Sequence, residues 1–110
     1  MERWLITVQT DCTDPSREKE FNDWYDQIHV PDVLKVPGIV RATRYENAIP
    51  GAEQSKFLIL LEVEADDVWK VTTALQEHSS KAEEEGRMSE LLKISSGAVY
   101  RQIAAPVDST

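Results

Sequence analysis

The stretch that decides the fold is FNDWYDQIHVPDVLKVPG, residues 21–38. Its apolar side chains follow the i, i+3, i+4, i+7 spacing that marks one face of an α-helix: Phe21, Trp24, Tyr25 and Ile28. His29 comes four residues after Tyr25, so these two side chains are expected to be neighbours on the helix surface. The stretch therefore predicts an aromatic helix that ends in a titratable group.

The bounds of this helix are predicted from its prolines. Asp14 and Pro15 are a favourable start, with Asp14 as the N-cap and Pro15 in the first helical position. Pro31 has no N–H to donate and its ring clashes with the preceding turn. We therefore expect the helix to run from about Pro15 to about Val30. Pro31 can also open a short second turn through Val33, Leu34 and Val36. After it, Pro37-Gly38 predicts a turn into a strand.

The remaining elements give the order β-α-β-β-α-β. Four strands are expected at Trp4–Thr10, Ile39–Glu46, Lys56–Ala65 and Ile94–Ile103. A second helix is expected from Val68 to about Glu85. A polar loop at 47–55 contains Pro50-Gly51. This order is the split βαβ arrangement of ferredoxin-like domains, an α+β fold with a four-stranded antiparallel sheet covered by helices on one face. We expect a single domain at residues 1–104 and a flexible tail at 105–110.

The third strand carries a further prediction. Its centre, Phe57–Leu61, is apolar at every successive position, which indicates that both faces of the strand are buried. Helices on one side of the sheet can cover only one of those faces. The simplest second cover is the sheet of another copy, so we expect a homodimer.

Composition limits the class of partner. A chain of 110 residues fits one small domain, and its net charge of −8 argues against nucleic acid or an anionic membrane surface. The single cysteine, Cys12, excludes an internal disulfide and fits a reducing compartment. Met1–Arg3 leads directly into the first expected strand, and the longest apolar run is far shorter than the roughly 20 residues of a membrane span. We expect a cytoplasmic protein without a signal peptide.

His29 is the main candidate for chemistry. An imidazole with an ordinary pKa of about 6.5 can accept or donate a proton near neutral pH. If Asp32 reached a ring nitrogen, it would fix the tautomer and raise the basicity of His29. Tyr25 could donate a hydrogen bond to a substrate oxygen. The competing interpretation is that His29 only ends the helix, where the dipole favours a partly positive ring.

Three aromatic side chains are candidates for shaping an apolar substrate pocket: Trp24, Trp69 and Tyr45. The competing interpretation is that they are ordinary packing residues. Metal binding is weakly supported, because the only histidines are His29 and His78 and a single His-x-x-Asp motif cannot supply three zinc ligands. The sequence has no glycine-rich phosphate loop and no Gly-x-Ser-x-Gly motif. We therefore expect no metal and no cofactor, which leaves acid–base chemistry.

Residues 21–34, followed by Val36-Pro37-Gly38 and Arg41–Tyr45, resemble the dimeric α+β barrel superfamily. The EthD-like proteins are the closest match and the stress-responsive A/B-barrel proteins a more distant one. Those families carry aromatic residues, a histidine and a proline at a helix end, then a Pro-Gly turn and a strand with basic and aromatic residues. The resemblance covers residues 4–46 in sequence and only the topology beyond them. It implies a ferredoxin-like subunit, a homodimer whose two sheets form a barrel, and a pocket between helices and sheet.

The resemblance also implies a range of activities. Superfamily members include cofactor-independent lyases, cyclases, isomerases and monooxygenases acting on small hydrophobic or aromatic compounds. His29 matches the histidine of the motif, while Asp32 and Tyr25 are added from local geometry. We expect a lyase, isomerase or cyclase of catabolic or secondary metabolism. The alternatives are a non-catalytic dimer that binds a hydrophobic ligand or serves a stress response, and a cofactor-free monooxygenase.

Overall fold

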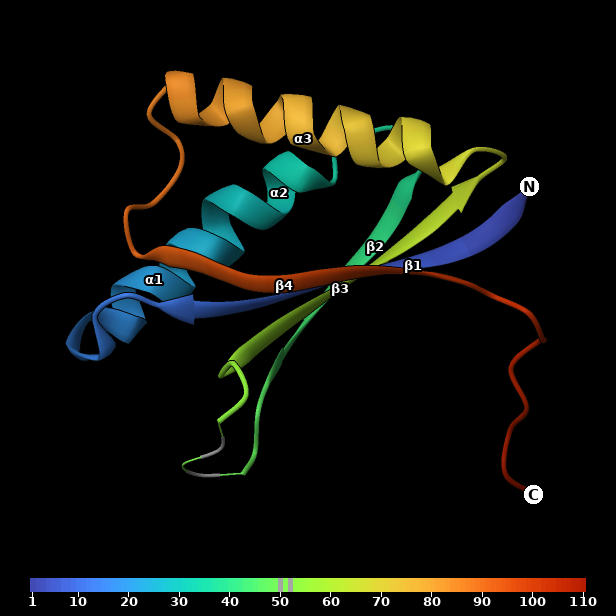
Figure 1. Cartoon of the computed structure of the whole chain (residues 1–110), viewed down its shortest axis with the longest axis horizontal. Coiled ribbons are helices and arrows are strands. Elements are labelled where there is room, and N and C mark those ends of the chain that lie inside the picture. Colours follow the sequence, from blue (N-terminus) through green and yellow to red (C-terminus); the bar gives the residue numbers. More distant parts are fainter. Residues whose placement is uncertain (50, 52) are drawn as a thin grey trace.

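A computed structural model describes residues 1–49, 51 and 53–110 of the chain (Figure 1). Its four strands are β1 (Glu2–Cys12), β2 (Ile39–Glu46), β3 (Phe57–Ala65) and β4 (Leu92–Arg101). They form one sheet in the order β2-β3-β1-β4, and every neighbouring pair is antiparallel. The helices all lie on one side of it. The predicted ferredoxin-like α+β fold is confirmed, although Pro50 of the predicted loop lies outside the described residues.

The first helical segment begins where the sequence predicted. The Asp14 carboxylate accepts a hydrogen bond from the backbone N–H of Ser16 at 3.0 Å, which caps the first turn. The segment then changes its winding several times: a 3₁₀ turn η1 (Pro15–Arg17), α1 (Glu18–Trp24), a π-helical turn η2 (Tyr25–His29) and α2 (Val30–Val33).

Pro31 does not stop the helical path near Val30, but it does open the short second turn that its position also predicted. The backbone N–H of Val30 bonds to the carbonyl of Tyr25, five residues back, so η2 is one residue wider than an α-helical turn. Pro31 then falls in the first turn of the short α2, where a missing N–H disrupts no α-helical bond. The helix continues to Val33, and the chain turns at Gly38 with a positive φ of 96°.

The second long helix, α3 (Val68–Glu84), is capped by Asp67, whose carboxylate accepts from the N–H of Trp69 at 3.0 Å. Gly86, with φ of 74°, follows its end. None of the helices in the described part of the chain is long and apolar enough to cross a membrane.

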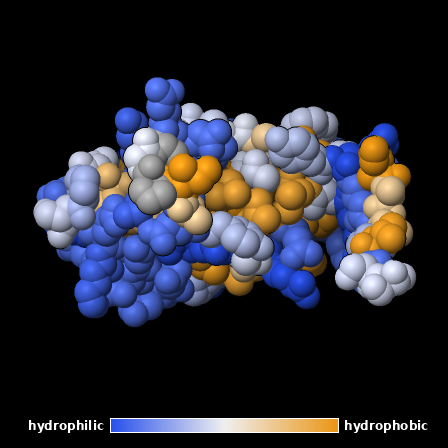
Figure 2. Space-filling view, turned by 90° about the horizontal axis from the view of Figure 1, so that it is seen from below, coloured by the Kyte–Doolittle hydropathy of each residue, from blue (hydrophilic) through white to orange (hydrophobic). Residues whose placement is uncertain are grey.

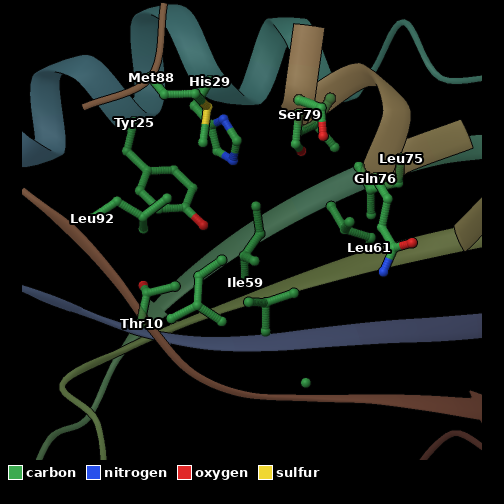
Figure 3. Close-up of a pocket in the computed structure, with 15 residues that line it drawn as sticks. Thr10, Tyr25, His29, Ile59, Leu61, Leu75, Gln76, Ser79, Met88 and Leu92 are labelled. Atoms are coloured by element: carbon green, nitrogen blue, oxygen red, sulfur yellow. The ribbon is translucent and has the colours of Figure 1, made fainter. Parts of the chain in front are cut away.

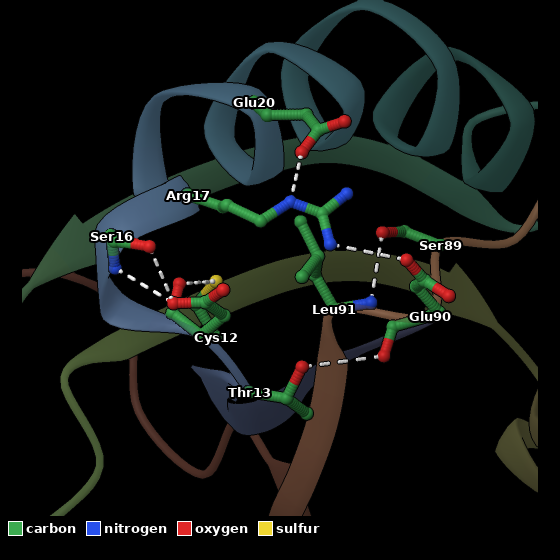
Figure 4. Close-up of polar contacts among 9 residues, drawn as sticks. Cys12, Thr13, Ser16, Arg17, Glu20, Ser89, Glu90 and Leu91 are labelled. Carbon is green, nitrogen blue, oxygen red and sulfur yellow. Dashed lines mark hydrogen bonds and ion pairs between the residues drawn. The ribbon is translucent and has the colours of Figure 1, made fainter.

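Residues 85–91, the α3–β4 connection, lead back to the sheet and are tied to the first helical segment. The Arg17 guanidinium donates to Glu90 at 3.1 Å and to Glu20 at 2.7 Å (Figure 4). The backbone N–H of Thr13 donates to the carbonyl of Leu91 at 2.8 Å. These contacts fix the path of the connection over the edge of the sheet.

Burial alternates along β3. Phe57, Ile59, Leu61 and Val63 are buried against the helices, and they form the main core with Ile6, Phe21 and Tyr25 among others. Leu58 and Leu60 point to the opposite side and are half-buried. Within one chain, the strand is therefore fully buried on one face only.

The side of the sheet that faces away from the helices is here called the open face. The strand registers place on it the side chains of Leu5, Tyr45, Leu58, Leu60 and Tyr100. Tyr45 is 49% exposed and Tyr100 is 57% exposed. Figure 2 shows this side of the molecule, where a band of hydrophobic residues runs between hydrophilic margins.

Candidate functional site

A cavity of about 600 Å³ lies between the inner face of the sheet, η2, α3 and the α3–β4 connection. Most of its lining is apolar and comes from all of these elements, with Ile59 and Leu61 on its floor and Leu75 and Met88 around it (Figure 3). Its polar lining groups are Thr10, Tyr25, His29, Gln76, Ser79 and Ser80. A largely apolar cavity with a few convergent polar groups is the usual form of a small-molecule site.

The π-helical turn sets the position of His29. Its wider winding places residues five apart one above the other, and the His29 ring stacks on Trp24 with centroids 4.9 Å apart and planes at 19°. The same ring meets Tyr25 edge-on, again at 4.9 Å. Trp24 is itself anchored, because its indole N–H donates to the carbonyl of Arg87 at 2.8 Å. His29 is thus held at the cavity wall by aromatic contacts.

His29 is uncharged at neutral pH. Burial lowers its pKa from 6.5 to about 4, since a charged imidazolium would lose its hydration there. The negative charge of Asp32 works in the opposite direction, while His78 and Arg44 lower the pKa further. The imidazole therefore has one ring nitrogen able to accept a proton.

Tyr25 presents a protonated hydroxyl beside His29. The side chain is 2% exposed, and burial raises its pKa above the ordinary value despite the opposing charge of Arg44. The Arg44 guanidinium lies 4.1 Å from the centre of the Tyr25 ring and is held there by Asp26 and Asn22 at 2.8 and 2.9 Å. In Figure 3 the Tyr25 hydroxyl points into the cavity on the side of Thr10.

The structure corrects the expected role of Asp32. Among the described residues no hydrogen bond joins Asp32 to His29; its carboxylate accepts from Arg87 at 2.9 Å and from Lys35 at 3.4 Å. The chain stays helical through Pro31, so Asp32 points to the α3–β4 connection. Its role is to hold Arg87, whose carbonyl accepts from Trp24.

Replacing Asp32 with asparagine is expected to lower the free energy of unfolding by about 1–3 kcal/mol. The substitution removes the charge from a carboxylate that is buried and bonded to a guanidinium. Urea denaturation measures the loss. The matched control is Asp23→Asn, whose partner Lys19 is 91% exposed, and its effect should stay within about 0.5 kcal/mol. Equal effects at the two sites would contradict the structural role of Asp32.

The lowered pKa of His29 predicts a pH dependence of stability. The unfolded chain binds a proton near pH 6.5 and the folded chain only near 4. Stability from the neutral His29 is therefore complete above pH 6.5 and is lost as the pH falls toward 4, by about 3 kcal/mol. Unfolding measured across this range should show the loss in the wild type and not in His29→Gln. If the free energy of unfolding depended on pH in the same way in the wild type and in His29→Gln, the burial of a neutral imidazole would be contradicted.

The aromatic candidates have different positions. Trp24 lies behind His29 and supports it without lining the cavity. Trp69 is 64% exposed on α3, because its side chain lies beside the apolar row of Val68 and Val71 and not within it. Tyr45 lies on the open face, on the opposite side of the sheet from His29. The structure thus corrects the expectation that Trp69 and Tyr45 line this cavity.

Several lining residues were not selected from the sequence. Thr10 is 1% exposed and follows Ile6 and Val8 on the inner face of β1, so strand alternation could have found it. Ser79 follows Leu75 by four residues, which places it on the inner face of α3. It was overlooked because the surrounding segment is highly charged. Met88 lies in irregular structure, where no sequence periodicity exists.

The chain matches no protein-family model, and it matches no curated protein. Its structure is similar to several solved ones. An ethyl tert-butyl ether D (EthD) family protein from Bacillus halodurans is 18% identical, with a TM-score of 0.58, covering 94% of this chain and 100% of that one. A dimeric ferredoxin-like protein from an uncultured marine organism is 10% identical, with a TM-score of 0.66 and coverages of 96% and 100%.

A third similar structure is a candidate monooxygenase from Shewanella loihica. It is 15% identical, with a TM-score of 0.60, covering 96% of this chain and 99% of that one. All three likenesses extend over nearly the whole chain, and at these identities they establish the fold. The chain therefore shares the ferredoxin-like α+β fold of these proteins, as the order of its elements predicted.

Proposed function

We propose that the protein is an enzyme that performs acid–base chemistry on a small hydrophobic or aromatic molecule, of the lyase, isomerase or cyclase type. The observation that carries this proposal is the pairing of a neutral imidazole, His29, with a protonated hydroxyl, Tyr25, at the wall of an apolar cavity. Two groups whose environments leave one as a base and the other as an acid are the usual basis of such chemistry.

In this proposal His29 removes a proton from a substrate carbon next to a carbonyl group. The electron pair of the broken C–H bond forms a carbon–carbon double bond, and the π pair of the carbonyl moves to its oxygen. Tyr25 donates a hydrogen bond to the negative charge that develops there. That charge also favours the imidazolium as it forms, which offsets the low pKa of His29 in the empty cavity. Return of the proton to another atom completes an isomerisation, and expulsion of a leaving group completes a lyase reaction.

The proposed active form is a homodimer that pairs two open faces. Its support is the hydrophobic band across the open face and the likeness to a dimeric ferredoxin-like protein. Leu60→Glu places a charge on that band and should shift the protein from dimer to monomer at micromolar concentration in sedimentation. Trp69→Glu, on the exposed side of α3, is the control and should sediment as the wild type does. A wild type that is itself a monomer would contradict the pairing.

The proposed chemistry can be tested with a panel of small ketones and lactones. Wild type and His29→Ala are incubated with each compound, and turnover is followed together with oxygen consumption. Turnover that requires His29 and consumes no oxygen supports the acid–base function. Equal turnover by both proteins contradicts it.

A cofactor-free monooxygenase is the second candidate. It is favoured by the fold shared with the Shewanella loihica protein, which is described as a candidate monooxygenase. The same cavity could hold an electron-rich phenol, and oxygen consumption with such a phenol would distinguish this activity. Ligand binding without turnover of any compound would instead favour the non-catalytic dimer.

A further inference from the structure

The cavity that holds His29 has an uncharged lining. Charged residues make up 29% of the chain, yet the fifteen described residues that line the cavity include no Asp, Glu, Lys or Arg. Two arginines close to the aromatic wall of the site have carboxylate partners: Arg44 pairs with Asp26, and Arg87 pairs with Asp32. His29 adds no charge at neutral pH.

The polar groups of the cavity fall into two sets. Thr10, Tyr25 and His29 come from the strand floor and η2, while Gln76, Ser79 and Ser80 come from α3. Figure 3 shows the two sets on different sides of the cavity, with the apolar side chains of Ile59 and Leu61 between and beneath them. The reaction proposed above uses only the first set, which leaves the second without a role.

We propose that the cavity takes an uncharged, largely apolar ligand with a polar group at each end. One polar group meets Tyr25 and His29, and the other meets Gln76 and Ser79. This inference rests on the proposed function for the role of the first set and names the class of substrate. Carboxylates and sulfonates of the same shape are rejected, since the lining offers them no counter-charge.

The physical reason is the cost of desolvation. Gln76 is exposed and Ser79 is half-buried, so a group bound between them loses part of its hydration. For an ionised group this loss is not offset by an opposite charge, whereas for a hydroxyl that finds a hydrogen bond the net cost is much smaller. Gln76 and Ser79 supply amide and hydroxyl groups, which can donate to or accept from a neutral hydroxyl or carbonyl. The second set therefore selects a ligand that has a neutral polar group at its far end.

Three biphenyl probes test both parts of the inference by calorimetry at pH 7: 4-hydroxybiphenyl, 4,4′-dihydroxybiphenyl and 4′-hydroxybiphenyl-4-carboxylate. The diol should bind about threefold to tenfold more tightly than the mono-alcohol, because of its second hydrogen bond. The carboxylate should bind at least about tenfold more weakly than the diol.

Variants of α3 locate these effects. Gln76→Leu should reduce the advantage of the diol over the mono-alcohol. Gln76→Arg should improve carboxylate binding about tenfold by supplying the missing charge, whereas Trp69→Arg, at an exposed position of α3 about two helical turns from Gln76, should not. Ser79→Trp, which fills the cavity, should abolish binding of all three probes.

Carboxylate binding as tight as that of the diol, or a diol no better than the mono-alcohol, would overturn the inference. So would binding that persists in Ser79→Trp, or no binding of any probe by the wild type. These are binding measurements, so they are independent of the catalytic test. If the affinities follow the predicted order but no turnover depends on His29, the inference about the ligand stands and the proposed function fails. If turnover depends on His29 but the affinities do not follow that order, the proposed function stands and the inference fails.

Discussion

Replacing His29 with alanine is expected to lower kcat/KM by about 10²–10⁴-fold on any substrate that the protein turns over. This is the usual contribution of a positioned general base. His29 meets the requirements of that role: it lines the cavity, it is neutral at pH 7, and Trp24 and Tyr25 fix its ring. The other lining residues of the cavity would still bind the substrate in His29→Ala, so its affinity should change much less than its turnover.

Two further variants separate catalysis from structure. His29→Gln keeps a polar side chain of similar length but has no basic nitrogen, so its kcat should fall nearly as far as that of His29→Ala. Gln27→Ala, in the same π-helical turn but on its exposed side, should retain wild-type kinetics. Substantial activity in His29→Gln would mean that the ring acts through its position and not by accepting a proton.

Phe21→Ala is expected to lower the free energy of unfolding by about 3–5 kcal/mol, the usual cost of removing a buried phenyl ring. Phe21 is fully buried, with 0% exposed. Its ring contacts Tyr25 edge-on at 5.6 Å and lies 5.6 Å from Phe57 on the sheet. It therefore joins the helix that carries the site to the strand beneath it, and the aromatic contacts add to the burial.

Urea denaturation monitored by circular dichroism measures this loss. Ile28→Ala is the matched control, because Ile28 belongs to the same apolar row of the sequence but is 43% exposed. Its effect should be much smaller than that of Phe21→Ala. Similar losses for the two variants would show that the row predicted from sequence, and not burial against β3, determines stability.

Much of the fold could be predicted because it depends on periodicity and on local signals. Alternation and apolar runs located the four strands, and β2 has the predicted bounds Ile39–Glu46. Asp14 caps the helix that follows it, as predicted from its type and position, and Asp67 caps α3 in the same way. These features depend on neighbours within a few residues, which a single sequence displays.

The candidate site was less predictable because it depends on contacts that are distant in sequence. His29 and Tyr25 were found through their helical spacing, but the π-helical turn that stacks His29 on Trp24 has no sequence signal. Asp32 could not be placed without knowing that Arg87, 55 residues later, competes for it. Tyr45 was misplaced because a strand has two faces, and spacing alone does not say which one faces the cavity.

Proton exchange in heavy water tests the role of His29 most directly. The acidic protons next to the carbonyl of 2-tetralone, a neutral aromatic ketone, exchange with D₂O at a rate that nuclear magnetic resonance can follow. A general base at the cavity wall should accelerate this exchange about 10²-fold or more in the wild type, and His29→Gln should lose the acceleration. Equal exchange rates in the presence of the wild type and His29→Gln would contradict proton abstraction by His29.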